Sequence, residues 1–218
     1  MTIIADRNIR QRELIPPDKL AQTRITLIGV GAIGRQAALQ LSAIGVPKLQ
    51  LIDFDFVAPE NLAAQGFYEQ DLNSPKVEAV ANVCRAINSE IEVTTANKRF
   101  TGLQFTGGVI FCCVDKIETR RSIFNSVKNR ANLWIDSRMS AEYLRILTIY
   151  DNPSQEYYLT TLFPAAEAYQ GSCTNKSIIY CANIAAGMMV AQFAKWLRGC
   201  DLNMDIDLNL LTNEMGVK

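Results

Sequence analysis

A glycine-rich turn followed by an acidic residue is the first pattern in this chain that indicates chemistry. Gly29, Gly31 and Gly34 form a GxGxxG turn between an apolar run and a helical segment. In such turns the first glycine permits the tight bend, the second admits a phosphate and the third allows close packing. Asp53 ends the next apolar run, about twenty residues on, where a carboxylate reaches ribose hydroxyls. The pattern predicts a nucleotide site without separating NAD from ATP, and a tight turn in a non-binding α/β fold is the alternative.

Cys173 is the candidate nucleophile, because a thiolate can attack an acyl group without a general base and the chain contains no histidine. That absence argues against Ser-His-Asp and Cys-His hydrolases. Cys173 precedes a predicted long helix and lies near Lys176, and a helix N-terminus lowers a thiol pKa. The alternative is an idle cysteine. We expect the other cysteines to be core residues or, for the last, an exposed tail residue: Cys84, Cys112, Cys113, Cys181 and Cys200. No CxxC pair occurs, so no zinc is expected.

Composition narrows the class of protein. The 218 residues contain 22 Lys+Arg and 22 Asp+Glu, so nothing favours nucleic acid as a partner. No apolar run approaches the ~20 residues of a membrane span. The N-terminus has no apolar signal core, which predicts a cytoplasmic location without membrane contact.

The order of predicted elements indicates an α/β, Rossmann-like fold, with a mainly parallel sheet flanked by helices and an antiparallel C-terminal extension. Strands are predicted at 24–29, 48–53, 90–95, 108–114 and 132–136, and helices at 35–44, 75–88, 116–129 and 177–197. Ser74 is expected to cap the second helix. Residues 144–150 and 156–162 are predicted to pair around the turn Asp151-Asn152-Pro153, and 206–211 to form a last edge strand. We expect one domain over 1–218, with an N-terminal arm at 1–22 and a candidate catalytic-cysteine loop at 163–176.

The stretch 51–76 carries a more specific pattern. It contains Asp53-Phe54-Asp55, then Asn61-Leu62 with Gln65, then Lys76. This order resembles the ThiF/MoeB/HesA superfamily, with its DFD, NLxRQ and helix-opening lysine, and in particular a minimal bacterial ubiquitin-activating-type enzyme. Further similar segments lie at 7–11 (RxxRQ), 114–120, 173–174 and 182–199, so the resemblance covers nearly the whole chain.

The resemblance implies ATP and Mg²⁺ as cofactors and a ubiquitin-like protein as partner. The C-terminal carboxylate of that protein would be adenylated, pass to Cys173 as a thioester and then to a conjugating enzyme. Asp53 would hold the ribose, Lys76 the triphosphate and Asp115 the Mg²⁺. Arg10 would reach phosphates from a neighbouring subunit, which implies a homodimer. The expected ATP-site residues are Gly29, Gly31, Gly34, Asp53, Asp55, Asn61, Gln65, Lys76 and Asp115. Since a carboxylate nucleophile is already ionised, this chemistry needs orientation and charge neutralisation rather than a general base.

Two positions depart from the family pattern: Ala64 replaces the arginine of NLxRQ, and Ala32 replaces a glycine of the turn. Arg7, Arg12 and Arg35 are candidate substitutes for the lost arginine. Arg138 follows a predicted strand and meets either the substrate carboxylate or a structural ion-pair partner. Sulfur transfer in cofactor biosynthesis and a non-catalytic subunit of a heterodimer are the alternative functions. An NAD-dependent oxidoreductase leaves Lys76 and Asp115 without a role.

Overall fold

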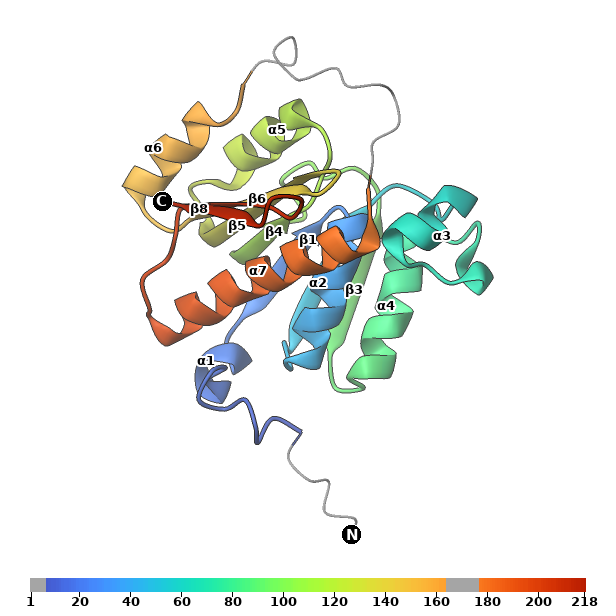
Figure 1. Ribbon diagram of the computed structural model, residues 1–218. Helices are drawn as coiled ribbons and strands as arrows, with labels where there is room; N and C mark the ends of the chain where they lie inside the picture. Colours follow the sequence, from blue (N-terminus) through green and yellow to red (C-terminus); the bar gives the residue numbers. More distant parts are fainter. Residues whose placement is uncertain (1–6, 164–176) are drawn as a thin grey trace.

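One eight-stranded sheet runs through the protein, with strand order β3-β2-β1-β4-β5-β6-β7-β8 (Figure 1). The structure is a computed structural model that describes residues 7–163 and 177–218. The strands are β1 (Arg24–Ile28), β2 (Lys48–Asp53), β3 (Glu92–Asn97), β4 (Gly108–Cys112), β5 (Ala131–Ser140), β6 (Tyr143–Ile149), β7 (Asp205–Asn209) and β8 (Glu214–Val217). Strands β1 to β5 pair in parallel, and β6 to β8 add in antiparallel. The predicted Rossmann-like class with an antiparallel extension is confirmed.

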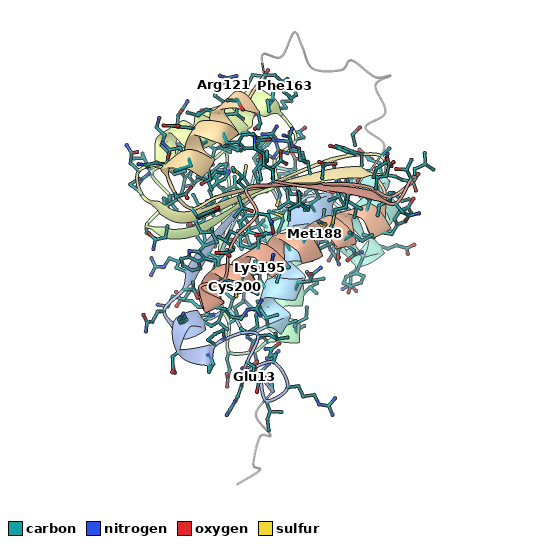
Figure 2. The ribbon with its side chains drawn as sticks, turned by 60° about the vertical axis from the view of Figure 1, so that its left-hand side comes forward. Glu13, Arg121, Phe163, Met188, Lys195 and Cys200 are labelled. Atoms are coloured by element: carbon teal, nitrogen blue, oxygen red, sulfur yellow. The ribbon has the colours of Figure 1, made fainter. Side chains whose placement is uncertain are left out.

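Helices cover both faces of this sheet. They are α1 (Pro17–Ala21), α2 (Ala32–Ala43), α3 (Pro59–Gln65), α4 (Lys76–Ile87), α5 (Ile117–Val127), α6 (Asn152–Thr160) and α7 (Ile179–Arg198), with a 3₁₀ turn at Glu69–Asp71. The larger core cluster joins α2, α4 and α7 to one face, and the smaller joins α5 and α6 to the other. Figure 2 shows this division, with Met188 of α7 and Arg121 of α5 on opposite sides of the sheet. Within the described residues, no helix is both long and apolar enough to cross a membrane.

Strand β4 shows why the central strands read as unbroken apolar runs. Val109 and Phe111 belong to the larger cluster, whereas Ile110 and Cys112 belong to the smaller one. Successive side chains of a strand point to opposite faces, so a strand covered on both sides needs an apolar residue at every position. Phe111 then packs edge-on against Phe193 of α7, with ring centroids 6.1 Å apart.

The predicted strand at 156–162 is wrong, because residues 152–160 form helix α6. Asp151 is its N-cap and accepts a hydrogen bond at Oδ1 from the backbone N–H of Ser154 (2.9 Å). Pro153 lies in the first turn of the helix, a position that suits proline. The capping residues were interpreted as a hairpin turn. Strand β6 pairs instead with β5 and β7, and β8 rather than β7 forms the edge of the sheet.

Two details around α3 and α4 also differ from the sequence prediction. Ser74 does not cap α4, whose N-cap is Pro75 without a side-chain hydrogen bond. Helix α3 was not predicted at all. It begins after Ala58, whose N–H donates to Oδ1 of Asn61 (3.0 Å), and ends at Gly66 in the left-handed conformation. This short helix lies over the glycine turn and therefore matters for the site.

Candidate nucleotide-binding site

The glycine turn lies at the point where the chain changes direction across the sheet. Strand β1 is flanked by β2 on one side and β4 on the other, and open α/β sheets bind ligands at this switch point. Gly29 has φ +86°, and a Cβ there would come within 2.9 Å of the Cys113 carbonyl carbon. A Cβ on Gly34 would overlap the carbonyl oxygen of Gly29. A Cβ on Gly31 would meet only the Gln65 side chain, at 3.6 Å, so packing does not demand that glycine.

Asp53 ends β2 beside this turn. Its Oδ2 accepts a hydrogen bond from the backbone N–H of Val30 (2.7 Å), and its Oδ1 accepts one from Asp55 (2.9 Å). Burial raises the pKa of Asp53, although these two N–H groups and the nearby Lys76 charge act against the rise. The carboxylate is thereby fixed against the first residue after the turn's opening glycine.

Lys76 joins the same region from the start of α4. Its Nζ lies 3.2 Å from Oδ2 of Asp55, and its backbone N–H donates to the Asp55 carbonyl oxygen (3.0 Å). The Lys76 side chain is 8% exposed, whereas the Asp55 side chain is 49% exposed. A bridge between Phe56 and Pro75 holds the two segments together. The fold thus brings Asp53, Asp55 and Lys76 together at the carboxyl end of β2.

Helix α3 supplies two residues with different environments. Asn61 is buried and uses its side-chain oxygen to cap the helix. The Gln65 side chain lies against Gly31, and its Oε1 is buried without a hydrogen-bond partner among the described residues. Buried polar atoms in native proteins are nearly always paired. Gln65 therefore presents an unsatisfied acceptor at the glycine turn, whereas the Asn61 oxygen is already committed to the helix.

Asp115 approaches the turn from the other side. It follows β4, whose continuation is held by a hydrogen bond from the Cys113 N–H to the Ile28 carbonyl (2.8 Å). Asp115 is exposed. Residues 7–163 and 177–218 contain no group of three or more His, Cys, Asp or Glu residues that could hold a metal. Mg²⁺ at nucleotide sites is held by one or two carboxylates together with phosphates and water, so a single exposed carboxylate fits it.

A buried ionic cluster that the sequence patterns did not predict lies around the middle of β5. Asp136 is fully buried, and it pairs with Arg120 and with Arg138, whose Nε lies 3.1 Å from Oδ2. Tyr158 of α6 donates its O–H to the same oxygen (3.1 Å). Arg138 also donates to the Thr161 carbonyl (2.8 Å), so the structural alternative holds for Arg138. A charged residue within the apolar strand sequence was the available signal, because buried charges need partners.

Arg7 and Arg35, two candidate substitutes for the arginine lost at Ala64, make contacts elsewhere. Arg7 donates to Oδ1 of Asn88 (2.7 Å), just after the C-terminal end of α4. Arg35 is 4% exposed, and its guanidinium stacks over the rings of Phe67 and Tyr68 at 5.3 and 5.5 Å. Arg12 is exposed, in the N-terminal arm.

The arm that carries Arg10 lies at the far end of α2 from the glycine turn. Gln11 donates to the carbonyl oxygen of Ile44, the C-cap residue of that helix (2.9 Å). Helix α2 has 12 residues, which corresponds to a length of about 18 Å. Figure 1 shows the arm and α1 at the end of the molecule away from α3. Arg10 is exposed there, and the glycine turn of the same subunit is at the opposite end of α2.

The cysteines outside the candidate loop behave as predicted. Cys84, Cys112 and Cys181 are buried, and Cys200 is exposed. Cys113 packs partly buried against the core, and burial raises its thiol pKa. Cys173 lies outside the described residues. Helix α7 begins at Ile179, so Cys173 precedes it by six residues (179 − 173).

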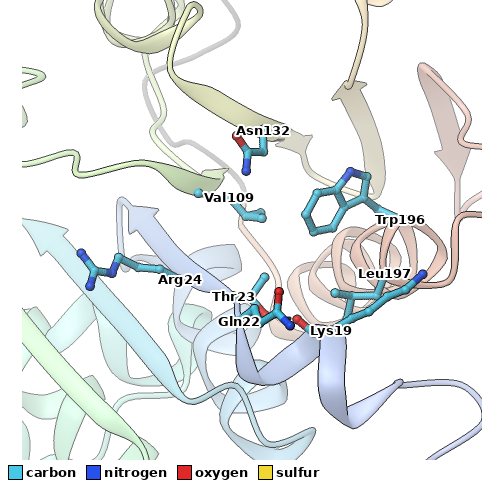
Figure 3. A pocket seen from close by; sticks show the side chains of 9 residues that line it. Lys19, Gln22, Thr23, Arg24, Val109, Asn132, Trp196 and Leu197 are labelled. Carbon is cyan, nitrogen blue, oxygen red and sulfur yellow. Dashed lines mark hydrogen bonds between the residues drawn. The ribbon is translucent and has the colours of Figure 1, made fainter.

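A cavity of about 310 Å³ lies at the amino ends of β1 and β4 (Figure 3). Arg24 and Gly108, which begin these two strands, line it together with Trp196 of α7. None of the predicted site residues is among its lining residues. The cavity therefore lies at the amino ends of the central strands, and the candidate site lies at their carboxyl ends.

Comparison with known proteins gives a consistent result. The profile of the ThiF family matches residues 6–215. Ubiquitin-like modifier-activating enzyme 5 of Culex quinquefasciatus is 27% identical over 207 residues, covering 83% of this chain and 52% of the relative. The sulfur carrier protein ThiS adenylyltransferase of Escherichia coli strain K12 is 26% identical over 167 residues, covering 74% and 66%. The chain thus spans about half to two thirds of these relatives.

Among solved structures, E. coli MccB with ATP superimposes with a TM-score of 0.73 at 17% sequence identity. The superposition covers 92% of this chain and 65% of MccB. At this identity the likeness shows a shared fold.

Proposed function

Since the chain belongs to the ThiF family, we propose that it is an adenylyltransferase that uses ATP to activate the C-terminal carboxylate of a ubiquitin-like protein. The observation that carries the proposal is the convergence of Asp53, Lys76, Gln65 and Asp115 around one glycine turn at the switch point of the sheet. These residues come from four separate segments of the chain. Their meeting point suits a nucleotide with a ribose, phosphates and a metal ion.

In this proposal each group has a role that its geometry supports. Asp53 accepts hydrogen bonds from ribose hydroxyls, next to the two N–H groups that already fix it. Lys76 exchanges its half-exposed partner Asp55 for phosphate oxygens. Gly31 admits a phosphate, and the Gln65 side-chain amide lies against that position, where its NH2 group can donate to phosphate oxygens. Asp115 holds Mg²⁺, which neutralises phosphate charge.

The reaction follows from charge placement. A carboxylate oxygen of the partner's C-terminus attacks the α-phosphorus, the bond to the bridging oxygen breaks, and pyrophosphate leaves with the electron pair. The attacking group is already an anion, so no side chain has to remove a proton. Lys76 stabilises the negative charge that accumulates on the phosphates, and electrostatic stabilisation of this kind is usually the largest single contribution to catalysis.

The missing arginine at Ala64 leaves room for a cation from a second subunit. Arg10 is exposed at the end of α2 remote from its own turn, so it does not serve that site. We place Arg10 at the phosphates of a neighbouring copy in a homodimer. A domain of this kind over residues 1–218 then works as a pair, with Arg10 of the arm at 1–22 presented to the partner's site.

Cys173 in the loop 163–176 is proposed to take the acyl group. Its thiolate attacks the carbonyl carbon of the acyl adenylate, AMP leaves, and a thioester remains for a conjugating enzyme. A Cys173→Ala variant should adenylate the partner and form no reductant-sensitive band on a non-reducing gel. Cys200→Ala is the matched control and should keep the band. A band that persists in Cys173→Ala would place the nucleophile elsewhere.

A sulfur-carrier function is the second candidate, favoured by the similarity to the ThiS adenylyltransferase. It shares the adenylation step and differs in what receives the acyl group. Wild-type protein that adenylates its partner yet forms no thioester band would support this function.

Pyrophosphate exchange into ATP tests the adenylation step itself. The assay uses the ubiquitin-like protein encoded nearest the gene of this chain. The control is the same protein with its last residue removed. Exchange should require the intact C-terminus and Mg²⁺. Calorimetry that shows tight NAD binding and none for ATP would overturn the proposal.

A further inference from the structure

A buried carboxylate is connected through one arginine to the turn that carries Asp115. Asp136 is fully buried and pairs with the guanidinium of Arg120, which is 4% exposed. The Nη2 group of Arg120 donates to the carbonyl oxygen of Val114. Val114 directly precedes Asp115. A continuous path of contacts therefore runs from Asp136 through Arg120 to the backbone beside Asp115.

The charges of this cluster do not require Arg120. Asp136 carries one negative charge and faces two guanidiniums, those of Arg120 and Arg138. Arg138 alone would neutralise the carboxylate. A second buried guanidinium adds a positive charge whose desolvation is unfavourable. Burial accordingly lowers the pKa of Arg120. The contact that distinguishes Arg120 from Arg138 is its bond to the Val114 carbonyl, since Arg138 donates to Thr161 at the end of α6.

The turn itself has fixed ends and an exposed centre. On one side the Cys113 N–H is bonded to β1, and on the other α5 begins at Ile117. Asp115 lies between these points and is exposed. A hydrogen bond to the carbonyl immediately before Asp115 restricts the backbone rotation that aims its side chain.

We propose that Arg120, held in place by Asp136, is a positioning residue that orients Asp115 toward the metal ion. The inference rests on the proposed function, in which Asp115 binds Mg²⁺ with ATP. Groups that orient metal ligands without touching the metal typically change metal affinity by about 10–100-fold when they are removed. Arg120 would thus act on the Mg²⁺-dependent part of ATP binding and leave the remaining part unchanged.

The test measures how much Mg²⁺ tightens ATP binding, by calorimetry with ATP in Mg²⁺ and with ATP in EDTA. In Arg120→Met the Asp136–Arg138 pair stays intact, so the cluster keeps balanced charge. We expect the Mg²⁺-dependent tightening to fall by roughly tenfold, with metal-free ATP affinity unchanged. The double variant with Asp115→Ala should lose no more than Asp115→Ala alone, because both changes act through one carboxylate.

Tyr158→Phe is the matched control. It removes another hydrogen bond to Asp136 and leaves the contact between Arg120 and Val114. It should lower the unfolding midpoint without changing the effect of Mg²⁺. Should Arg120→Met fail to fold, Arg120→Lys keeps the charge, and its single ammonium cannot span Asp136 and Val114 together. That variant should also lose Mg²⁺-dependent tightening.

The outcomes separate this inference from the proposed function. Wild-type protein that binds no ATP would overturn both. Wild-type binding that Mg²⁺ tightens, together with unchanged tightening in the Arg120 variants, would overturn the role of Arg120 alone. A loss of Mg²⁺ effect in Tyr158→Phe equal to that in Arg120→Met would show a general effect of destabilisation and also reject the positioning role.

Discussion

Two aspartates that follow parallel strands differ sharply from two aspartates of the strands that join and form the antiparallel part. Asp55 and Asp115, after β2 and β4, are exposed, and Asp55 has one cationic partner in Lys76. Asp136 on β5 and Asp205 on β7 are buried and are each held by arginine and tyrosine side chains. An exposed carboxylate with one partner can exchange that partner for a ligand, whereas a buried, multiply bonded one stabilises the fold. The same residue type thus indicates binding at one end of the sheet and architecture at the other.

The largest expected effect is the loss of activity when an exposed aspartate of the proposed site is replaced. Asp115→Ala should abolish pyrophosphate exchange, because it removes the carboxylate proposed to hold Mg²⁺. Its unfolding free energy should stay within about 0.5 kcal/mol of wild type, as for other exposed substitutions. Exchange assays and urea unfolding on the same preparation check both values. Exchange near the wild-type rate would show that Asp115 is not the metal residue.

Asp136→Ala should show the opposite profile. It leaves the Arg120 and Arg138 guanidiniums without their buried partner, and breaking a buried pair in this way costs about 3–5 kcal/mol. Urea unfolding measures the loss. Lys76→Ala is the comparison, because it also breaks an ion pair. The carboxylate left behind, Asp55, is half-exposed, so this variant should lower stability far less. Equal losses in the two variants would remove the distinction between the clusters.

A partial effect is expected from subunit mixing. Arg10→Ala and Lys76→Ala should each lower exchange, and a mixture should recover part of it. In a mixed dimer, one site has an intact Lys76 and receives Arg10 from the partner. Exchange activity is measured across mixing ratios, with subunit exchange confirmed independently. Absence of recovery at every ratio would argue against action between subunits.

The smallest effect concerns pH. Burial alone raises the pKa of Asp205, but hydrogen bonds from Arg145 and Tyr157 outweigh it and lower the pKa below its ordinary value. A carboxyl whose folded pKa is depressed contributes stability above its unfolded pKa, about 3.9, and loses it as pH falls through the folded pKa. The difference in unfolding free energy between wild type and Asp205→Asn should therefore narrow below about pH 4.

Urea unfolding at a series of pH values checks this narrowing. Asp201→Asn, at an exposed aspartate, is the control and should show a small difference at every pH. A difference for Asp205→Asn that stays constant into acid would contradict the assignment of the lowered pKa to this contact.

Sequence patterns predicted the parallel sheet and the turn well, because both follow from local rules. Alternating burial along β4 and the spacing of Gly29, Gly34 and Asp53 depend on neighbours along the chain or on one sheet face. Helix α6 was missed since Asp and Pro are favoured both in turns and at helix starts, and the contact of Asp151 with Ser154 identifies the helix cap. An Asp-x-Pro sequence therefore predicts a helix start only when the following residue, here Ser154, is known to bond to the aspartate.

The partners of the buried Asp136 could not be predicted, because side-chain pairing depends on the three-dimensional fold. Periodicity places Asp136 on a buried strand and says nothing of Arg120 or Tyr158 on helices far along the chain. Arg35 illustrates the same limit: its charge suggested a phosphate contact, and the rings of Phe67 and Tyr68 hold it elsewhere. The sequence shows which charged residues are present, but the packing around α3 and α6 determines which of them can still bind a ligand.

Gly31 offers a practical consequence of the way the turn is packed. A side chain at Gly29 or Gly34 would collide with backbone, so variants there confuse misfolding with lost binding. An alanine at position 31 meets only the flexible end of Gln65 and occupies the space proposed for a phosphate. Gly31→Ala is therefore a suitable bait: a folded chain that is blocked before catalysis and can retain its protein partner for isolation and identification.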